Sequence, residues 1–288
     1  MAYNQPYDDE PRASRRAPRG GGRLMAAFLV ALMAFMSYQA MRSENPVTGE
    51  SQHVALSASQ EVALGLQAAP EMAAQHGGLV PDSDPDAVIV DAIGAELVRG
   101  YPDLKKTPYR FEFHLLKDPE TVNAFALPGG QIFITRGLYK RLRTPGMIAG
   151  VLGHEIGHVV ERHGAQQMAQ AQLTQGLTAA AAMATYDPNN PSTAAGAAVA
   201  QMVGKLVNLK YGRQDELESD EWGVILTASA GYDPRAVIEV MKVLQAAAGG
   251  KAPPEFMSTH PDPGNRIERL QGLIKETFPN GLPAGMKS

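Results

Sequence analysis

The hydrophobic and polar positions of the chain first form one long apolar run, from Leu24 to Met41. As a helix, this run would be about 27 Å long, near the lower limit for crossing a bilayer. Five arginines precede it and one follows, a bias that places the N-terminus in the cytoplasm. The pattern favours an uncleaved transmembrane anchor over 24–41. A signal peptide is the alternative, although no A-x-A cleavage pattern ends the run.

The segments on either side of the run are polar. Residues 1–23 include a run of three glycines and cannot bury a core, so we predict a disordered basic tail. Residues 42–56 contain the turn-rich segment Asn45–Gly49, which indicates a linker. One folded domain is then expected over 57–280.

Within this domain, helical and alternating patterns follow one another in short segments. Ser57 with Gln60 is typical of a capping box, and Asp84-Pro85 of a helix start. Thr144-Pro145 is a third start, and Gly164 is the expected end of that helix. Alternation predicts strands over 109–116, 122–127 and 131–135. Further helices are expected over 165–184, 193–211, 213–230, 235–248 and 263–278, with a Gly- and Pro-rich loop over 249–264. The predicted fold class is α+β and mainly helical.

The helix that begins at Pro145 contains the sequence HEIGH, from His154 to His158. Histidines four residues apart lie on one face of a helix, where they can bind one Zn²⁺. Glu155 is placed to accept a proton from the attacking water rather than to bind the metal. It is the only charged residue between Val151 and Val160, as expected of a buried helix. Two core histidines with structural roles are the alternative interpretation.

A catalytic zinc site needs a third protein ligand. The arrangement HExxHxxGxxH fails, because Gly164 occupies its last position. His163 is rotated away from the ligand face and is expected to cap the end of the helix. Three other histidines have no neighbours typical of ligands and are expected to be structural or exposed: His53, His76 and His114.

The acidic segment 215–221 offers the missing ligand. Glu216 and Asp220 share one face of a helix, whereas Glu218 points about 200° away from Glu216. We predict that Glu216 is the third ligand and that Asp220 forms a hydrogen bond with a ligand histidine. Glu218 is the substitute ligand, and a solvated acidic face is the alternative interpretation.

Composition excludes several classes of function. A net charge of -4 argues against a general nucleic-acid binder. The chain has no cysteine, which excludes disulfides, thiolate zinc sites and cysteine nucleophiles. Its 288 residues suffice for one sizeable core or two small domains.

Together these features resemble the zinc metallopeptidases of the HtpX and CAAX prenyl endopeptidase family. Within it, the chain is most similar to the bacterial periplasmic quality-control members. The similarity covers most of 45–275, and the family's ExxxD pattern falls on Glu216 and Asp220. The markers are Asn45-Pro46-Val47-Thr48-Gly49, Asn123–Gly130, the HEIGH helix, Glu216–Asp220, and Ser258-Thr259-His260-Pro261 with Arg266.

The resemblance implies a gluzincin-type core, with a small β-sheet packed on the HExxH helix and one Zn²⁺ per chain. It implies that an extended substrate pairs with an edge strand from 123–135. It also places His260 and Arg266 near the metal, where they could stabilise an oxyanion or block the open position at rest. The substrate-binding residues would be Asn123, Ala124, Phe125 and Ala126, and the catalytic group would comprise Glu155, His260, Arg266 and Asp220.

The predicted function is a membrane-anchored, extracytoplasmic zinc endopeptidase that acts on unfolded or misassembled envelope proteins. The expected location is the bacterial inner membrane, with a single span and a periplasmic catalytic domain, and no nucleic acid is expected as a partner. The first alternative is a tethered chaperone or adaptor that binds extended polypeptides with little cleavage, although the intact Glu155 argues against it. A second alternative is a hydrolase of other bonds, such as peptidoglycan amides.

Overall fold

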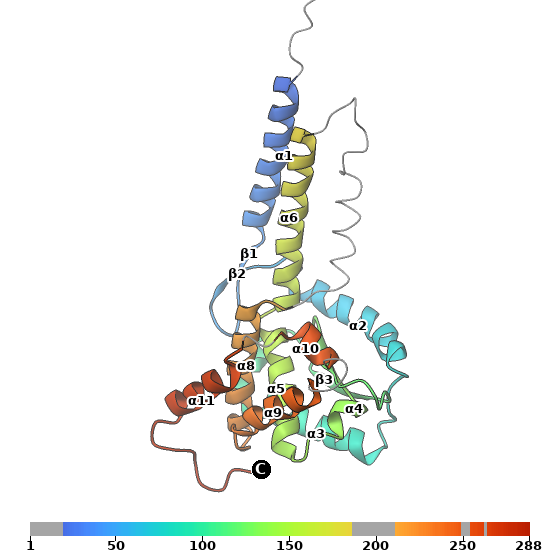
Figure 1. Cartoon of the computed structure of the whole chain (residues 1–288), viewed down its shortest axis with the longest axis vertical. Helices are drawn as coiled ribbons and strands as arrows, with labels where there is room; N and C mark the ends of the chain where they lie inside the picture. The colour runs from blue at the N-terminus through green and yellow to red at the C-terminus, as the bar shows by residue number, and fades with distance from the viewer. Residues whose placement is uncertain (1–19, 186–210, 249–253, 262–263) are drawn as a thin grey trace, which may run out of the picture.

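In the computed structural model, which describes residues 20–185, 211–248, 254–261 and 264–288, two long helices project from a folded body (Figure 1). The described helices are α1 (Gly20–Ala40), α2 (Ala58–Gln75), α3 (Pro85–Gly100), α4 (Arg136–Tyr139), α5 (Pro145–Val160), α6 (His163–Thr185), α8 (Arg213–Ser229), α9 (Ala236–Ala248), α10 (Glu255–Thr259) and α11 (Arg266–Thr277), with a 3-10 helix at Pro102–Lys106. The strands are β1 (Arg42–Glu44), β2 (Ser51–His53), β3 (Glu112–Leu116), β4 (Ala124–Leu127) and β5 (Gln131–Thr135). A mainly helical α+β fold is confirmed.

Three predicted helix starts are confirmed by their caps. The Ser57 side chain accepts a hydrogen bond from the backbone of Gln60, completing a capping box at α2. Asp84 caps α3, with Pro85 in the first turn. Thr144 accepts from the backbone amide of Met147 at the start of α5. Local side-chain chemistry therefore fixes where these helices begin.

The larger sheet has the order β3-β5-β4. β3 runs parallel to β5, and β4 runs antiparallel to it, with Phe125 opposite Phe133. β4 therefore forms one edge of this sheet. Both outer strands are shorter than predicted: β3 begins at Glu112 rather than 109, and β4 at Ala124 rather than 122. Tyr109 instead donates its hydroxyl hydrogen bond to Glu61 of α2 at 2.6 Å.

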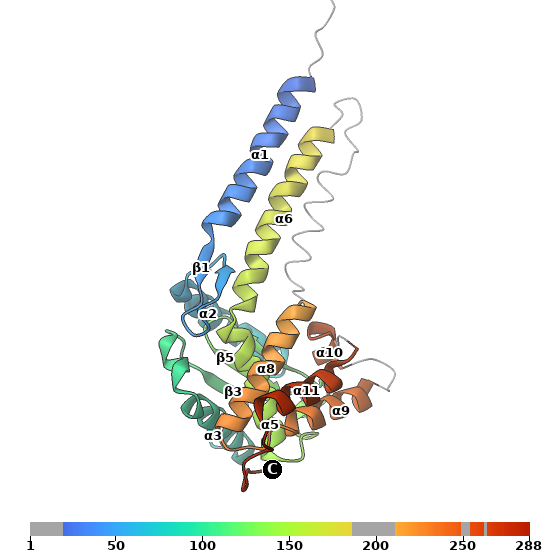
Figure 2. The same cartoon turned by 90° about the vertical axis from the view of Figure 1, so that its left-hand side faces the viewer.

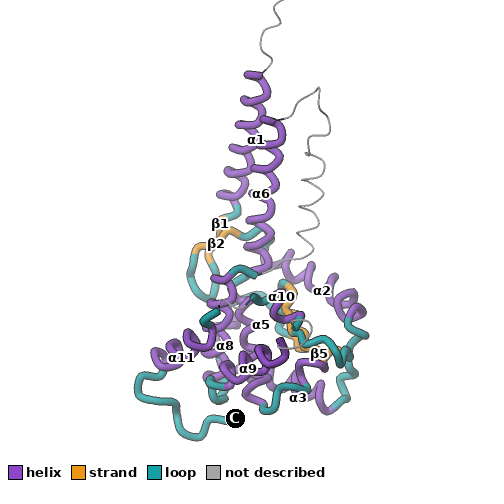
Figure 3. The backbone as a smooth tube through the Cα atoms, viewed as in Figure 1, coloured by secondary structure: helices purple, strands orange, loops and turns teal. Residues whose placement is uncertain are grey.

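Helix α5 lies at the centre of the body, with α8 and α9 beside it (Figures 2 and 3). Its glycines let α8 approach closely. A Cβ at Gly157 would lie 2.8 Å from the Cβ of Trp222 and 2.9 Å from the Cα of Ser219. Because real Cβ atoms do not come so close, a larger residue at Gly157 would push α8 away.

The helix predicted to end at Gly164 instead ends at Val160, and α6 begins at His163. Between them, Arg162 has a φ of 58°, the left-handed conformation that ends a helix. Its guanidinium is buried and donates two hydrogen bonds to Glu61, at 2.7 and 3.0 Å. This ion pair holds the break in place and directs α6 out along α1.

The segment 42–56, predicted as a linker, is folded. β1 and β2 pair as an antiparallel hairpin. The side-chain amide of Asn45 donates to the carbonyl of Val160 at 2.9 Å, and that of Gln52 donates to the carbonyl of Glu161 at 3.0 Å. The hairpin thus satisfies carbonyls at the end of α5 that have no partner within the helix.

Two further segments differ from the prediction. The expected loop 249–264 contains a short helix, α10, and α11 begins at Arg266 rather than 263. The predicted helix 193–211 lies almost entirely outside the described residues, as do residues 1–19 of the predicted tail. The division into tail, anchor, linker and domain remains a prediction.

The first helix fits the predicted anchor. Over Gly21–Ala40, α1 is the single described helix that is long and apolar enough to cross a membrane by length and composition. It begins at Gly20, four residues before the predicted anchor.

Candidate active site

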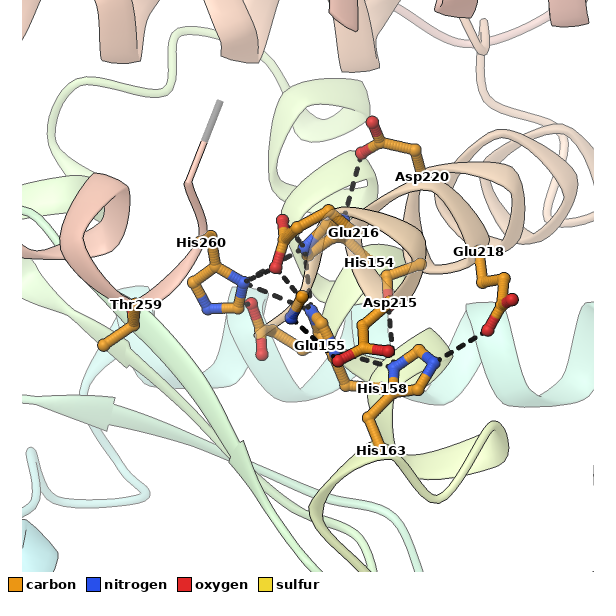
Figure 4. Close-up of polar contacts among 12 residues, drawn as sticks. His154, Glu155, His158, His163, Asp215, Glu216, Glu218, Asp220, Thr259 and His260 are labelled. Atoms are coloured by element: carbon orange, nitrogen blue, oxygen red, sulfur yellow. Dashed lines mark hydrogen bonds and ion pairs between the residues drawn. The ribbon is translucent and has the colours of Figure 1, made fainter. Parts of the chain in front are cut away.

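Helices α5 and α8 bring the three predicted metal ligands together, and the end of α10 adds a fourth group (Figure 4). The Nε2 atoms of His154 and His158 lie 3.1 Å apart. Each is 3.5 Å from a carboxylate oxygen of Glu216. His260 follows α10 and places its Nδ1 3.0 Å from Glu216 Oε1. All four side chains are buried.

The spacing of these four groups fits a metal ion. Nδ1 of His260 lies 3.2 Å from Nε2 of His158 and 3.4 Å from Nε2 of His154. The separations between the four groups therefore run from 3.0 to 3.5 Å. Ligand bonds of about 2.0–2.1 Å in a tetrahedron place neighbouring ligand atoms about 3.3–3.4 Å apart. This is the single such group of potential ligands among the described residues.

His154 is held by a carboxylate, as predicted from the helix spacing. Its Nδ1 lies 3.1 Å from Asp220 Oδ1, so Nε2 faces the centre. Arg266 donates to both oxygens of Asp220 at 2.6 Å and pairs with Glu216 at 3.2 Å. Burial lowers the pKa of His154, but hydrogen bonds to Asp220 and Glu216 outweigh it and raise the pKa to about 9 without a metal. Burial raises the pKa of Asp220, but the charges and hydrogen bonds of Arg266 and His154 outweigh it and lower the pKa.

His158 is held by a second histidine, which corrects the expectation that His163 caps the end of α5. His163 is fully buried at the start of α6, and its Nδ1 lies 2.9 Å from Nδ1 of His158. Its Nε2 lies 3.0 Å from Glu218 Oε2. Glu218 therefore contacts the site through His163 rather than as a ligand. Burial lowers the pKa of His158 well below its usual value, and the charge of His154 adds to the effect.

Glu155 lies beside these groups and makes no hydrogen bond. It is fully buried, and neither carboxylate oxygen has a hydrogen-bond partner in the described part of the chain. The nearest ring nitrogen, Nε2 of His260, is 3.8 Å away. Burial raises the pKa of Glu155. Burying a carboxylate without partners costs stability, so its presence needs a functional reason. Proton transfer to or from a bound water molecule is such a reason.

Comparisons with known proteins decide the family. The profile of peptidase family M48 matches residues 89–274. This chain belongs to peptidase family M48.

Relatives of this M48 peptidase have related names. It is 30% identical over 240 residues to the mitochondrial metalloendopeptidase OMA1 of Schizosaccharomyces pombe, covering 80% of this chain and 66% of that protein. It is 31% identical over 241 residues to the beta-barrel assembly-enhancing protease of Escherichia coli, covering 81% and 48%. A putative beta-barrel assembly-enhancing protease of Vibrio cholerae is 33% identical over 184 residues, covering 62% and 37%. The chain thus spans between about a third and two thirds of these relatives.

The predicted substrate residues of the M48 peptidase lie along the start of β4. Ala124 is fully buried, and Phe125 stacks on Phe133 with ring centroids 5.0 Å apart. The side-chain amide of Asn123 donates to Glu255 of α10 at 2.9 Å. Ala126 lines a small cavity with His158. The side chains of Asn123 and Ala124 are thus already enclosed, and what this edge strand can offer a ligand is its backbone.

Two aromatic residues of the site had not been predicted. Tyr211 stacks on His158 with ring centroids 3.8 Å apart, and Phe256 stacks on His260 at 4.3 Å. Neither belongs to a periodic pattern, and only the folded chain brings them to the histidines. Tyr211 also donates its backbone N–H to the carbonyl of Thr259 at 3.2 Å, which joins the segments on either side of the site.

The other histidines are structural, as expected. His76 lies 3.3 Å from Asp118, and His114 lies 2.9 Å from the Gln131 side chain. His53 stacks on Tyr38, with ring centroids 4.3 Å apart.

Proposed function

We propose that this chain is a membrane-anchored zinc endopeptidase that cleaves unfolded or misassembled proteins of the bacterial envelope. One observation carries the proposal: four potential ligand groups converge beside a buried, unbonded Glu155. The names of the relatives, a metalloendopeptidase and a beta-barrel assembly-enhancing protease, support peptide bonds and envelope proteins as targets.

In this proposal His154, His158 and Glu216 hold the zinc ion. Bound zinc supplies a Lewis acid that polarises the scissile carbonyl and makes a water molecule more acidic. Asp220 fixes the tautomer and direction of His154, and Arg266 keeps Asp220 ionised. Glu155 takes the proton from the attacking water and later delivers it to the leaving amine. Its raised pKa suits both halves of this exchange.

The substrate lies extended along the free edge of β4. An edge strand offers unpaired backbone N–H and C=O groups, so pairing with it requires no particular substrate side chains. This mode suits unfolded segments, which have free backbone groups of their own. Because β4 lies beside α5, a segment paired with β4 would lie close to the metal ligands.

His260 closes the site at rest. Its Nδ1 occupies the fourth position of the ligand group, and Asn123 ties the preceding helix α10 to the start of β4. A substrate on β4 competes with this contact, so binding would draw α10 and His260 away. His260 can then stabilise the negative charge that develops on the substrate carbonyl, while Arg266 keeps its hydrogen bonds to Asp220.

The anchor is α1, with the catalytic domain on the periplasmic face of the inner membrane. The arginines that precede α1 and its apolar composition support this orientation.

The test uses the full chain in detergent, because a fragment from Ser43 would cut β1 and remove the helix on which α6 packs. Wild type is expected to contain one zinc per chain and to cleave unfolded casein. Glu155→Gln should keep the zinc and lose activity about 100- to 10,000-fold. Glu216→Ala should lose both, whereas Glu239→Ala, which removes an exposed carboxylate on α9, should keep both and serves as the control.

Each outcome separates the candidate functions. Full proteolysis by Glu155→Gln would exclude the mechanism. A chaperone or adaptor is the second candidate, because His260 closes the site at rest. Casein binding that persists without zinc, with no cleavage products, would favour it. Zinc bound without cleavage in wild type, relieved by His260→Ala, would confirm the closed resting state.

A further inference from the structure

The helix that follows the HEIGH helix runs alongside the predicted anchor. α6 leaves the body next to α1 and lies antiparallel to it, and both views show the pair projecting together (Figures 1 and 2). The pairing is close at mid-height, where a Cβ added to Gly176 would collide with that of Ala34. If α1 crosses a membrane, α6 therefore has to be placed with respect to the same membrane.

The composition of α6 changes along its length. Its 23 residues include no Asp, Glu, Lys or Arg, which is unusual for a helix that projects into water. All five glutamines lie between Gln166 and Gln175. From Gly176 to Ala184 the sequence is GLTAAAAMA, with a threonine hydroxyl as its one polar side chain. The half of α6 nearest the body is polar, and the outer half is apolar.

The change in α6 occurs at the level where α1 also changes. Gly176 lies against Ala34, so the glutamines just before Gly176 lie level with Ser37, Tyr38 and Gln39, the polar end of α1. Two segments about 140 residues apart in sequence thus pass from polar to apolar at the same height. A shared boundary of this kind is what a membrane surface imposes, whereas packing between two helices in water does not require it.

The outer surface of the pair is apolar. Of the fourteen large hydrophobic side chains that are strongly exposed in the described residues, eight lie on α1 and two, Leu177 and Met183, on the outer half of α6. Leu177 is 45% exposed and Met183 40% exposed, so the described residues leave a large part of each side chain uncovered.

A cation lies beside the last described turn of α6. Carbonyls in the last turn of a helix have no hydrogen-bond partner within that helix, and in lipid no water molecule supplies the missing partner. The guanidinium of Arg23 on α1 donates to the carbonyls of Met183 and Ala184, each at 3.4 Å. The cation also compensates the negative end of the helix dipole.

We infer that the outer half of α6, Gly176–Thr185, is embedded in the lipid bilayer beside α1. Its ten residues are about 15 Å long, and its last described turn lies level with Arg23, so it extends as far into the bilayer as the apolar part of α1. The occupant of the exposed apolar surface is lipid rather than a second copy of the chain. This inference rests on the proposed anchoring by α1. The polar half of α6, from His163 to Gln175, is about 18 Å long. It therefore holds the metal ligands at about this distance from the membrane surface, which favours substrate segments close to that surface.

The absence of cysteine makes the inference directly testable. Single cysteines would be placed at Leu32, Gln170, Leu177 and Met183 in the full chain carrying Glu155→Gln, and labelled with a nitroxide. The protein would be reconstituted in vesicles of phosphatidylcholine and phosphatidylglycerol. Paramagnetic resonance then measures collision with oxygen, which concentrates in lipid, and with a water-soluble nickel chelate. Proteolytic activity has no part in this measurement.

The expected result is a ratio of oxygen to nickel accessibility several-fold higher at 177 and 183 than at 170, and similar to that at 32. High nickel accessibility at 177 and 183, with 32 protected, would overturn the inference and leave the anchor intact. High nickel accessibility at 32 as well would overturn both. Low accessibility to both reagents at 177 and 183 would show a protein partner in place of lipid and would also overturn the inference.

Discussion

The two histidines of the HEIGH helix are supported in different ways. His154 donates to Asp220, a buried carboxylate that Arg266 grips through two hydrogen bonds of 2.6 Å. His158 instead contacts His163, whose other nitrogen meets a carboxylate of Glu218 that is 31% exposed. On one side, Asp220 and Arg266 form an enclosed network of charged groups, and on the other, His163 links His158 to a partly exposed carboxylate.

The difference shows how one helix can present two ligands with unequal rigidity. A metal-binding histidine needs an outer partner that fixes its tautomer and orientation. Charge-assisted, bidentate hydrogen bonds are stronger and more directional than a single hydrogen bond between two rings. The Asp220 side should therefore contribute more to metal affinity than the His163 side. The predictions below run from the largest expected effect to the smallest.

Arg266→Leu should cause the largest loss. It leaves Asp220 ionised, buried and without its main cation, next to the carboxylate of Glu216. Breaking a buried ion pair in this way costs about 3–5 kcal/mol of the free energy of unfolding. Denaturant titration of the metal-free protein measures it. The double variant Arg266→Leu with Asp220→Leu should recover part of the loss, and a single-variant loss below about 0.5 kcal/mol would contradict a buried charged network.

Asp220→Asn should weaken zinc binding about 10- to 100-fold, since loss of an outer partner typically has this effect. The amide oxygen can still accept a hydrogen bond from His154. The negative charge that favours a proton on Nδ1 of His154 is lost. Competition with a zinc chelator of known affinity measures the change. Unchanged affinity would mean that the position of His154 is fixed by packing alone.

His163→Phe should weaken zinc binding less, by about tenfold, the lower end of the same range. The variant keeps an aromatic ring in the buried position and removes both nitrogens, so the effect is that of the hydrogen bond rather than of lost volume. The same chelator competition applies. A loss equal to that of Asp220→Asn would remove the distinction between the two sides of the site.

Glu218→Gln should have the smallest effect. Glutamine keeps an oxygen that accepts from His163, and the lost charge is partly exposed, where ion pairs contribute little. The free energy of unfolding should change by no more than about 0.5 kcal/mol, by denaturant titration. Loss of bound zinc in this variant would instead support Glu218 as the substitute ligand, against the position of its side chain beside His163.

Much of the site could be predicted because its spacing is local. His154 with His158 and Glu216 with Asp220 are each four residues apart, and helix geometry alone puts each pair on one face. His260 and Arg266 were expected through the family resemblance, since no periodicity connects the end of α10 with α5. His163 was misassigned because the sequence suggested one helix up to Gly164, whereas the left-handed Arg162 starts a new one.

The fold shows the same division. Caps at Ser57, Asp84 and Thr144 were predicted, since each depends on side chains within three residues. The hairpin over 42–53 was missed, because Asn45 and Gln52 are ordered by carbonyls more than 100 residues away.

The sequence by itself determined the faces of the helices: which side of α5 carries the histidines and which side of α8 carries the acids. Only the tertiary structure decided that these faces meet, that His260 completes the group, and that α6 turns to run beside α1. The physical reason is distance along the chain. Helix periodicity and capping involve neighbours within about four residues. The contacts at Gly157 and the ion pair of Arg162 with Glu61 join segments that the sequence keeps far apart.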